Sequence, residues 1–167
     1  MSLLSACAGI SPLGPGAEVT SSGAWQISKS TDSVTGEATG NIKLTANQTS
    51  HDGRTFPGGT GLQLVCFKGQ PVVHFIFIFQ IGSKSDSEIS YRFDDKPAHT
   101  IKPHILRGLE MMVIEDRSEV AQFMNGLATA NTLYLTINSL AKGGSTASFN
   151  VAGASPAIEL VHKACHG

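Results

Sequence analysis

The chain has 167 residues, of which 41% are hydrophobic and 15% charged, and its formal net charge is −1. These values are typical of a globular protein with room for one domain and one core. The near-neutral charge without a lysine or arginine cluster argues against nucleic acid as a ligand. The longest apolar run, residues 72–79, is too short to cross a bilayer as a helix.

The first 23 residues are expected to lie outside the folded domain, which we place at residues 24–167. Leu4-Ser5-Ala6-Cys7 has the residue order of a bacterial lipobox, in which the cysteine is lipidated. The charged and apolar parts of a full signal are missing, so the alternative is an ordinary terminus with an incidental cysteine. Residues 8–23 are rich in Gly, Pro, Ser and Ala, as flexible tethers are. Together these features predict export, with Cys7 as a lipid anchor.

The chain is organised around a predicted hairpin of two strands, residues 61–67 and 72–81, joined by a tight turn at residues 68–71. The first strand alternates between apolar and mixed faces, which indicates a half-buried strand. The second is apolar on both faces and is therefore predicted to be covered on both sides. Four of the eight phenylalanines lie between Phe67 and Phe79, which predicts that this hairpin is the centre of the core.

Other segments alternate in the same way and bring the prediction to about eight short strands. Residues 88–94 alternate so that Glu88, Ser90, Arg92 and Asp94 face solvent. The glycine-rich residues 50–61 are interpreted as a loop, and Gly143-Gly144 as a turn. The remaining strands are expected to start at Trp25 and to cover residues 42–46, 98–101, 109–114, 133–137 and 147–151.

Two short helices complete the predicted fold. Val120, Phe123, Met124 and Leu127 have the i, i+3, i+4, i+7 spacing of an amphipathic helix over residues 117–128. Asp116 or Ser118 can cap this helix, and Gly126 or Asn131 can help to end it. Ser155-Pro156 starts a second helix that is expected to reach about residue 164. The fold class is therefore mainly β, an antiparallel β-sandwich or open barrel with two short helices.

Two of the three cysteines are expected to point inward. Cys66 shares a strand face with Leu62 and Leu64, and Cys165 lies on the apolar side of the last helix. A disulfide between them would close a long loop and stabilise the fold by up to about 4–5 kcal/mol. Two buried free thiols are the alternative.

Candidate chemical sites are sparse. His162 and His166 share a helix face at i, i+4 and are weak metal candidates. A solvated helix end is the simpler interpretation, because Cys165 is lost as a ligand if it forms the disulfide. Asp94 is expected to pair with Arg92 on the solvent face. No Gly-x-Ser-x-Gly motif is present, and we assign no catalytic residue and no cofactor.

Several scattered positions resemble a family of small exported β-proteins, the VasI/TagO-type accessory proteins of type VI secretion. These are Trp25, the segment Leu62-Gln63-Leu64-Val65-Cys66, Tyr91-Arg92-Phe93-Asp94, and Phe149 with Gly153 before a helix ending in Cys165. Invasion-associated locus B proteins are similar in size and compartment. Their pattern has an early cysteine after the tryptophan, which residues 26–30 of this chain lack, and that difference favours the first family.

The resemblance implies a non-catalytic accessory or binding protein of the bacterial envelope, without metal or cofactor, in the periplasm or lipid-anchored at the outer membrane. Its partner would be another envelope protein, and contact with the membrane would be through the lipid anchor alone. We expect the binding surface on Glu88, Arg92 and Asp94 or on residues 50–61. An envelope hydrolase and a metal-handling periplasmic protein are the alternatives.

Overall fold

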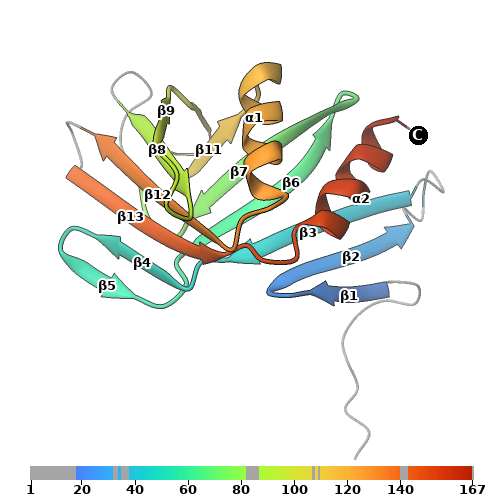
Figure 1. Ribbon diagram of the computed structural model, residues 1–167, viewed down its shortest axis with the longest axis horizontal. Helices are drawn as coiled ribbons and strands as arrows, with labels where there is room; N and C mark the ends of the chain where they lie inside the picture. The colour runs from blue at the N-terminus through green and yellow to red at the C-terminus, as the bar shows by residue number, and fades with distance from the viewer. Residues whose placement is uncertain are drawn as a thin grey trace, which may run out of the picture.

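The computed structural model is a mainly β protein built from two antiparallel sheets and two helices (Figure 1). It describes residues 18–31, 34, 38–81, 87–106, 108, 110–139 and 143–166. Cys7 lies outside the described residues, so its lipidation stays a prediction. The predicted fold class is confirmed, because the two sheets pack as an open sandwich around one hydrophobic core.

The larger sheet, sheet A, has the strand order β1-β2-β3-β6-β7-β11-β10. Its strands are β1 (Glu18–Ser22), β2 (Trp25–Thr31), β3 (Ala38–Thr45), β6 (Thr60–Phe67), β7 (Gln70–Phe77), β10 (His104–Leu106) and β11 (Met111–Ile114). Sheet B has the order β5-β4-β13-β12-β8-β9. Its strands are β4 (Gln48–His51), β5 (Arg54–Phe56), β8 (Glu88–Phe93), β9 (His99–Ile101), β12 (Thr132–Ser139) and β13 (Gly143–Asn150).

The β6–β7 hairpin lies at the centre of sheet A, as its composition predicts. Leu62 and Leu64 point into the core and pair with Phe75 and Val73, all four of them almost fully buried. The same alternation holds in β8, where Ile89, Tyr91 and Phe93 are buried on the facing sheet. The faces that period-2 alternation predicts to be buried are therefore the inner faces at which the two sheets meet.

Two details of the hairpin differ from the prediction. The turn consists of Lys68 and Gly69 alone, both with positive φ angles of 51° and 74°. Two such residues match the twist of a two-residue hairpin, so the next residue already belongs to β7. The second strand is not fully covered on both sides: His74 and Ile76 on its outer face are only half-buried, β7 ends at Phe77, and the next residue, Ile78, is 73% exposed.

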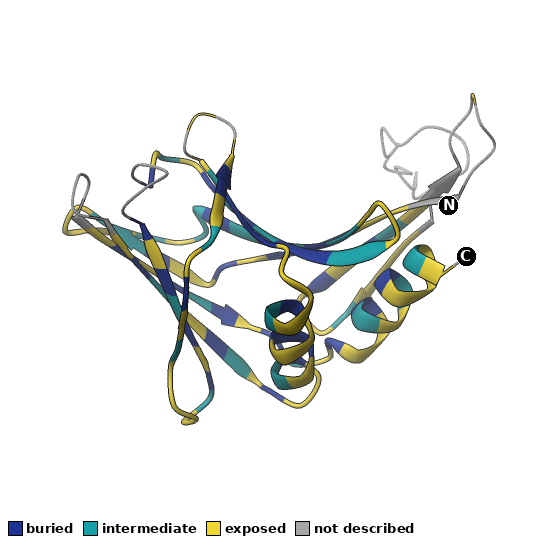
Figure 2. Ribbon diagram, turned by 90° about the horizontal axis from the view of Figure 1, so that it is seen from above, coloured by how far each residue is buried: buried dark blue, intermediate teal, exposed yellow. Residues whose placement is uncertain are grey.

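Helix α1 (Arg117–Leu127) fills the opening between the two sheets (Figure 2). The Phe123 ring lies 6.0 Å from Phe75 of sheet A, and 5.1 Å and 5.2 Å from Tyr91 and Phe93 of sheet B. All three contacts are edge-to-face, the arrangement that aromatic pairs prefer. The predicted helix is confirmed, and its apolar stripe joins the two sheets.

Gly126 serves packing within α1 and does not end the helix. A Cβ atom at this position would lie 2.5 Å from two ring carbons of Phe93. The helix ends one residue later at Leu127. Glycine is therefore kept at this position because the helix and the Phe93 ring approach each other too closely for any side chain.

Helix α2 (Ser155–His166) covers the inner face of β3, β6 and β7, beside α1 (Figure 1). Ala157 and Val161 form its buried side. The chain that leads into the helix is fixed by the Trp25 indole N–H, which donates to the Val151 carbonyl oxygen at 3.1 Å. Trp25 thereby connects β2 to the start of the C-terminal helix.

Three stretches expected to be irregular are strands. Residues 18–22, placed in the flexible tether, form β1 and pair along their full length with β2, so the tether prediction is wrong for these residues. Residues 50–61 contain β5 and the ends of β4 and β6 and are not one loop. Gly143 and Gly144 begin β13 and pair with Ser139 and Asn138. Backbone pairing in these segments does not depend on an apolar side-chain pattern, so alternation could not reveal them.

The Tyr91 hydroxyl is buried in the core without a hydrogen-bond partner among the described residues. Burial raises the pKa of Tyr91 to about 12, and the nearby Glu119 carboxylate adds to the shift. A buried hydroxyl without a partner has lost its water contacts and gained nothing in return. The ring is needed for packing, whereas the oxygen is a cost.

We expect Phe123→Ala to lower the free energy of unfolding by about 3–5 kcal/mol, because it removes the ring that joins the sheets and leaves a cavity. The matched control is Phe67→Ala, since Phe67 is 57% exposed and its loss should cost about 0.5 kcal/mol or less. Urea unfolding followed by circular dichroism measures both. Equal losses in the two variants would contradict the role of α1.

Tyr91→Phe is expected to leave stability unchanged or to raise it by roughly 1 kcal/mol, because only the unpaired hydroxyl is removed. Tyr134→Phe is the control, since Tyr134 is 42% exposed on the outer face of β12. The same denaturant titration decides the outcome. A loss above about 1 kcal/mol for Tyr91→Phe would mean that the hydroxyl is hydrogen-bonded after all.

Candidate functional site

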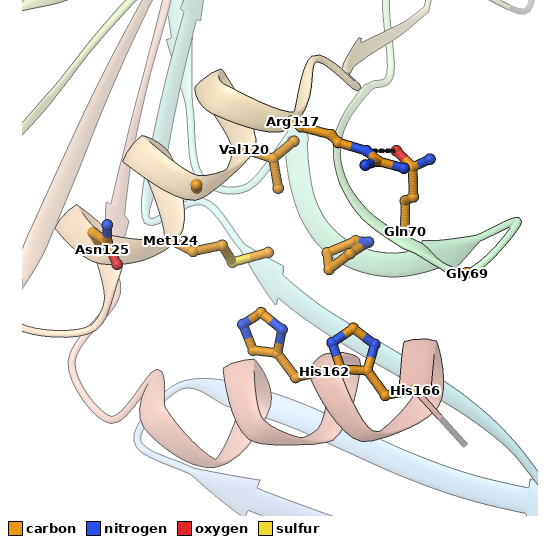
Figure 3. A pocket seen from close by; sticks show the side chains of 10 residues that line it. Gly69, Gln70, Arg117, Val120, Met124, Asn125, His162 and His166 are labelled. Carbon is orange, nitrogen blue, oxygen red and sulfur yellow. Dashed lines mark hydrogen bonds between the residues drawn. The ribbon is translucent and has the colours of Figure 1, made fainter.

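A cavity of about 440 Å³ opens between the two helices beside the turn of the β6–β7 hairpin (Figure 3). Its walls come from three elements: Gln70 and Pro71 of β7, Val120 and Met124 of α1, and His162 and His166 of α2. A volume of this size suits a small organic molecule. The cavity combines segments that are almost a hundred residues apart in the sequence.

The α1 wall begins at Asp116, the residue that caps the helix. Its Oδ1 atom accepts hydrogen bonds from the Ser118 hydroxyl (2.8 Å) and from the backbone N–H groups of Ser118 (2.9 Å) and Glu119 (3.1 Å). The Ser118 hydroxyl bond is the main cause that lowers the pKa of Asp116, and the two backbone bonds add to it. Asp116 is thus the cap that the sequence suggested, and Arg117 begins the helix at the rim of the cavity.

Arg117 is held in place by the central hairpin. Its Nε–H group donates to the Gln70 Oε1 atom at 3.1 Å, across 47 residues of sequence. Within the part of the chain that the structure describes, Arg117 forms no ion pair. Its positive charge is therefore oriented by a neutral partner and is not neutralised.

The α2 wall carries two imidazoles. His162 and His166 point into the cavity, with their ring centroids 6.3 Å apart (Figure 3). The adjacent Cys165 lies on the side of the helix that faces sheet A and forms a disulfide with Cys66 of β6. The bridge that the sequence suggested is present, and it fixes the helix that presents both histidines.

The disulfide bears directly on the metal site considered at His162 and His166. Cys165 cannot act as a thiolate ligand while it is bridged to Cys66. The described residues contain no group of three or more His, Cys, Asp or Glu side chains that could hold a metal ion. A structural zinc site needs four ligands, and two imidazoles supply half of that set.

The lining of the cavity has a definite chemical character. Arg117, Asn125, Gln70 and the two histidines supply hydrogen-bond donors, while Val120, Met124 and Pro71 supply an apolar floor. None of the ten lining residues has a hydroxyl, thiol, amine or carboxylate side chain. The site therefore has the groups to bind an anion with an apolar body, and the two imidazoles are its side chains with acid–base or nucleophilic capacity.

The surface expected at Glu88, Arg92 and Asp94 is only partly assembled. Glu88 and Arg92 lie exposed on the outer face of β8. Asp94 lies in the following turn, where its carboxylate accepts the backbone N–H groups of Asn131 (3.1 Å) and Thr132 (2.8 Å). The expected pairing of Asp94 with Arg92 is wrong, because the carboxylate completes the turn.

Arg92 packs instead on a neighbouring aromatic ring. Its guanidinium carbon lies 4.7 Å from the Tyr134 ring centroid. Both residues line a second cavity of about 500 Å³ on the outer face of sheet B, whose other polar side chains are mainly serine and threonine. This is a hydrophilic sheet face. Its neutral hydroxyls indicate the chemistry of a ligand less clearly than the guanidinium and imidazoles of the cavity between the helices do.

Sequence reasoning singled out His162 and His166 but overlooked Arg117 and Gln70, which line the same cavity. Arg117 entered only as the first residue of a helix. Its partner is 47 residues away, so no local spacing could connect the two. The one available signal is that an arginine at a helix start is unusual, since negative charge is favoured at this end.

None of the helices in the described part of the chain is long and apolar enough to cross a membrane. No family model matches the chain, and no curated protein matches it in sequence. Among solved structures, the crystal structure of invasion associated protein B from Bartonella henselae is similar, with a TM-score of 0.57 and 14% sequence identity. The match covers 90% of this chain and 99% of that one. At this identity the likeness concerns the fold.

This likeness bears on the two families that the sequence resembles. It supports the comparison with invasion-associated proteins at the level of fold. The missing cysteine after Trp25 had favoured the VasI/TagO-type proteins, which no family model supports.

We expect the double variant Cys66→Ala/Cys165→Ala to lose about 4–5 kcal/mol of stability, because the bridge joins positions 99 residues apart. In addition, amide exchange in α2 should speed up more than exchange in α1, since α2 loses its covalent attachment. Urea unfolding measures the loss of stability, and hydrogen exchange with mass spectrometry measures the exchange in each helix. Reductant should reproduce the effect in the natural sequence and leave the double variant unchanged. Unaltered exchange in α2 would show that packing alone fixes the helix.

Proposed function

We propose that the chain is a non-catalytic binding protein of the bacterial cell envelope, exported to the periplasm and held at the outer membrane through Cys7. The observation that carries this proposal is the Cys66–Cys165 disulfide. Disulfides persist in oxidising compartments such as the periplasm and are rare in the cytosol. The lipobox order of residues 4–7 and the tether-like residues 8–17 support the same route.

Binding is favoured over hydrolysis by the composition of the cavity between the helices. Its lining has donors and apolar groups, but no hydroxyl, thiol or carboxylate stands beside the two imidazoles to form a nucleophile–base pair. The metal-handling alternative is disfavoured because Cys165 is bridged and the described residues hold no cluster of three ligands. A binding role for the cavity agrees with both observations.

The finer proposal is an accessory role beside other envelope proteins, in the manner of the VasI/TagO-type proteins of type VI secretion. Its support is the set of residues that carry the resemblance, from Trp25 to Cys165. The similar solved structure is that of an invasion associated protein, and a role at the bacterial surface fits that description. A protein partner in the envelope is therefore part of the proposal.

Thiol labelling in cells of the source organism tests the proposal. Free thiols are blocked at lysis, disulfides are then reduced, and newly exposed thiols are labelled and mapped by mass spectrometry. We expect Cys66 and Cys165 to be labelled only after reduction, in protein recovered from the envelope fraction. The physical reason is that glutathione keeps cytosolic thiols reduced.

Two controls make the outcome decisive. A cytosolic protein with known free cysteines, followed in the same samples, shows that blocking was complete. Protease added to spheroplasts should remove the protein while the cytosolic control stays intact. Recovery in the cytosol with Cys66 and Cys165 both reactive before reduction would refute export and the envelope role together.

A further inference from the structure

We propose that the cavity between α1 and α2 binds a small aliphatic carboxylate, with the acid group at Arg117 and the hydrocarbon body on Val120 and Met124. The inference deepens the proposed binding function and rests on it, since it names the class of ligand. Its basis is the convergence of one guanidinium, further hydrogen-bond donors and apolar groups from three elements on one opening (Figure 3).

The acid end is assigned by Arg117. The Nε–H donation to Gln70 fixes the plane of the guanidinium and leaves its terminal N–H groups for a ligand. A guanidinium presents these groups as a rigid fork that matches two carboxylate oxygens. Because Arg117 has no ion pair within the described residues, a bound acid would not have to displace a carboxylate of the protein.

The sign of the ligand charge follows from the remaining polar groups. His162 and His166 on α2 and Asn125 on α1 can each donate a hydrogen bond into the cavity, and no acidic side chain lines it. Asp116, which precedes Arg117 in the sequence, uses its Oδ1 atom to cap α1. A cationic ligand would find no carboxylate on these walls, whereas an anion finds donors on both helices.

The aliphatic part is assigned by the floor. Val120 and Met124 belong to the buried stripe of α1, and Pro71 faces them from β7. Met124 is unbranched and can adapt its side chain to ligands of different length. Each methylene that enters such a site is worth up to roughly fourfold in affinity. An acid of medium chain length thus fits both the volume and the polarity of the cavity.

Isothermal titration of the oxidised full chain with octanoate and with octanamide tests the assignment. We expect octanoate to bind more tightly than octanamide, and butanoate to bind more weakly than octanoate. Arg117→Gln should weaken octanoate binding roughly tenfold, because it removes a charge-assisted contact at an exposed rim. It should leave octanamide binding unchanged.

The matched control is Arg92→Gln, the same substitution on the outer face of sheet B, which should leave octanoate binding unchanged. Ala121→Trp provides a second variant, since residue 121 lines the cavity on the exposed side of α1. The indole should fill the cavity and abolish binding of acid and amide alike. The urea midpoint of each variant shows that it is folded.

The source of the carboxylate is distinguished by a further pair of probes. Acetyl-glycyl-leucine has a free acid next to an apolar side chain, and its amide lacks the acid. Tighter binding of this acid than of octanoate would identify the C-terminal residue of a polypeptide as the ligand, and the reverse would identify a fatty acid. Either result supports carboxylate recognition.

Equal affinity for octanoate and octanamide would overturn the inference, as would equal losses in Arg117→Gln and Arg92→Gln. Absence of binding by all five probes, or binding of Zn²⁺ alone to His162 and His166, would also overturn it. Thiol labelling separates this failure from failure of the proposed function. An oxidised envelope protein that ignores carboxylates would lose only its ligand class, and a reduced cytosolic protein that binds them would lose only the envelope role.

Discussion

Cys66 on the inner face of β6 and Cys165 on the sheet-facing side of α2 are joined by a disulfide that connects positions 99 residues apart. The bridge attaches the last helix of the chain to the middle of sheet A, where α2 packs on β3, β6 and β7. Without it, α2 would depend on a short buried side that includes Ala157 and Val161. The covalent link therefore fixes the helix where burial of small side chains alone contributes little.

The two helices have complementary tasks on the same inner surface. Helix α1 closes the opening between the sheets with Phe123, whose ring contacts aromatic residues of both sheets. Helix α2 packs on β3, β6 and β7 of sheet A. Both helices contact β7 but they do not pack fully on each other, and the cavity that both line is the space that remains between them.

Much of the fold could be predicted because it depends on local periodicity. The alternation in β6 and β8 and the stripe of α1 identify their buried faces without any long-range information. The β4–β5 hairpin was missed although the pair Asp52-Gly53, with φ angles of 49° and 73°, is a strong two-residue turn signal. Other errors come from tertiary contacts: Gly126 accommodates the Phe93 ring, and Asp94 completes a turn with Asn131 and Thr132.

The candidate site was harder to predict, for a related reason. The sequence shows His162, Cys165 and His166 as neighbours, and this spacing suggests a metal. The fold separates them, since helix geometry places Cys165 on the sheet side and both imidazoles on the cavity side. The arginine that gives the cavity its charge is brought there by α1 and oriented by Gln70 of β7. The contribution of Arg117 to this cavity depends on the same disulfide. The bridge fixes α2, and α2 forms the wall opposite Arg117.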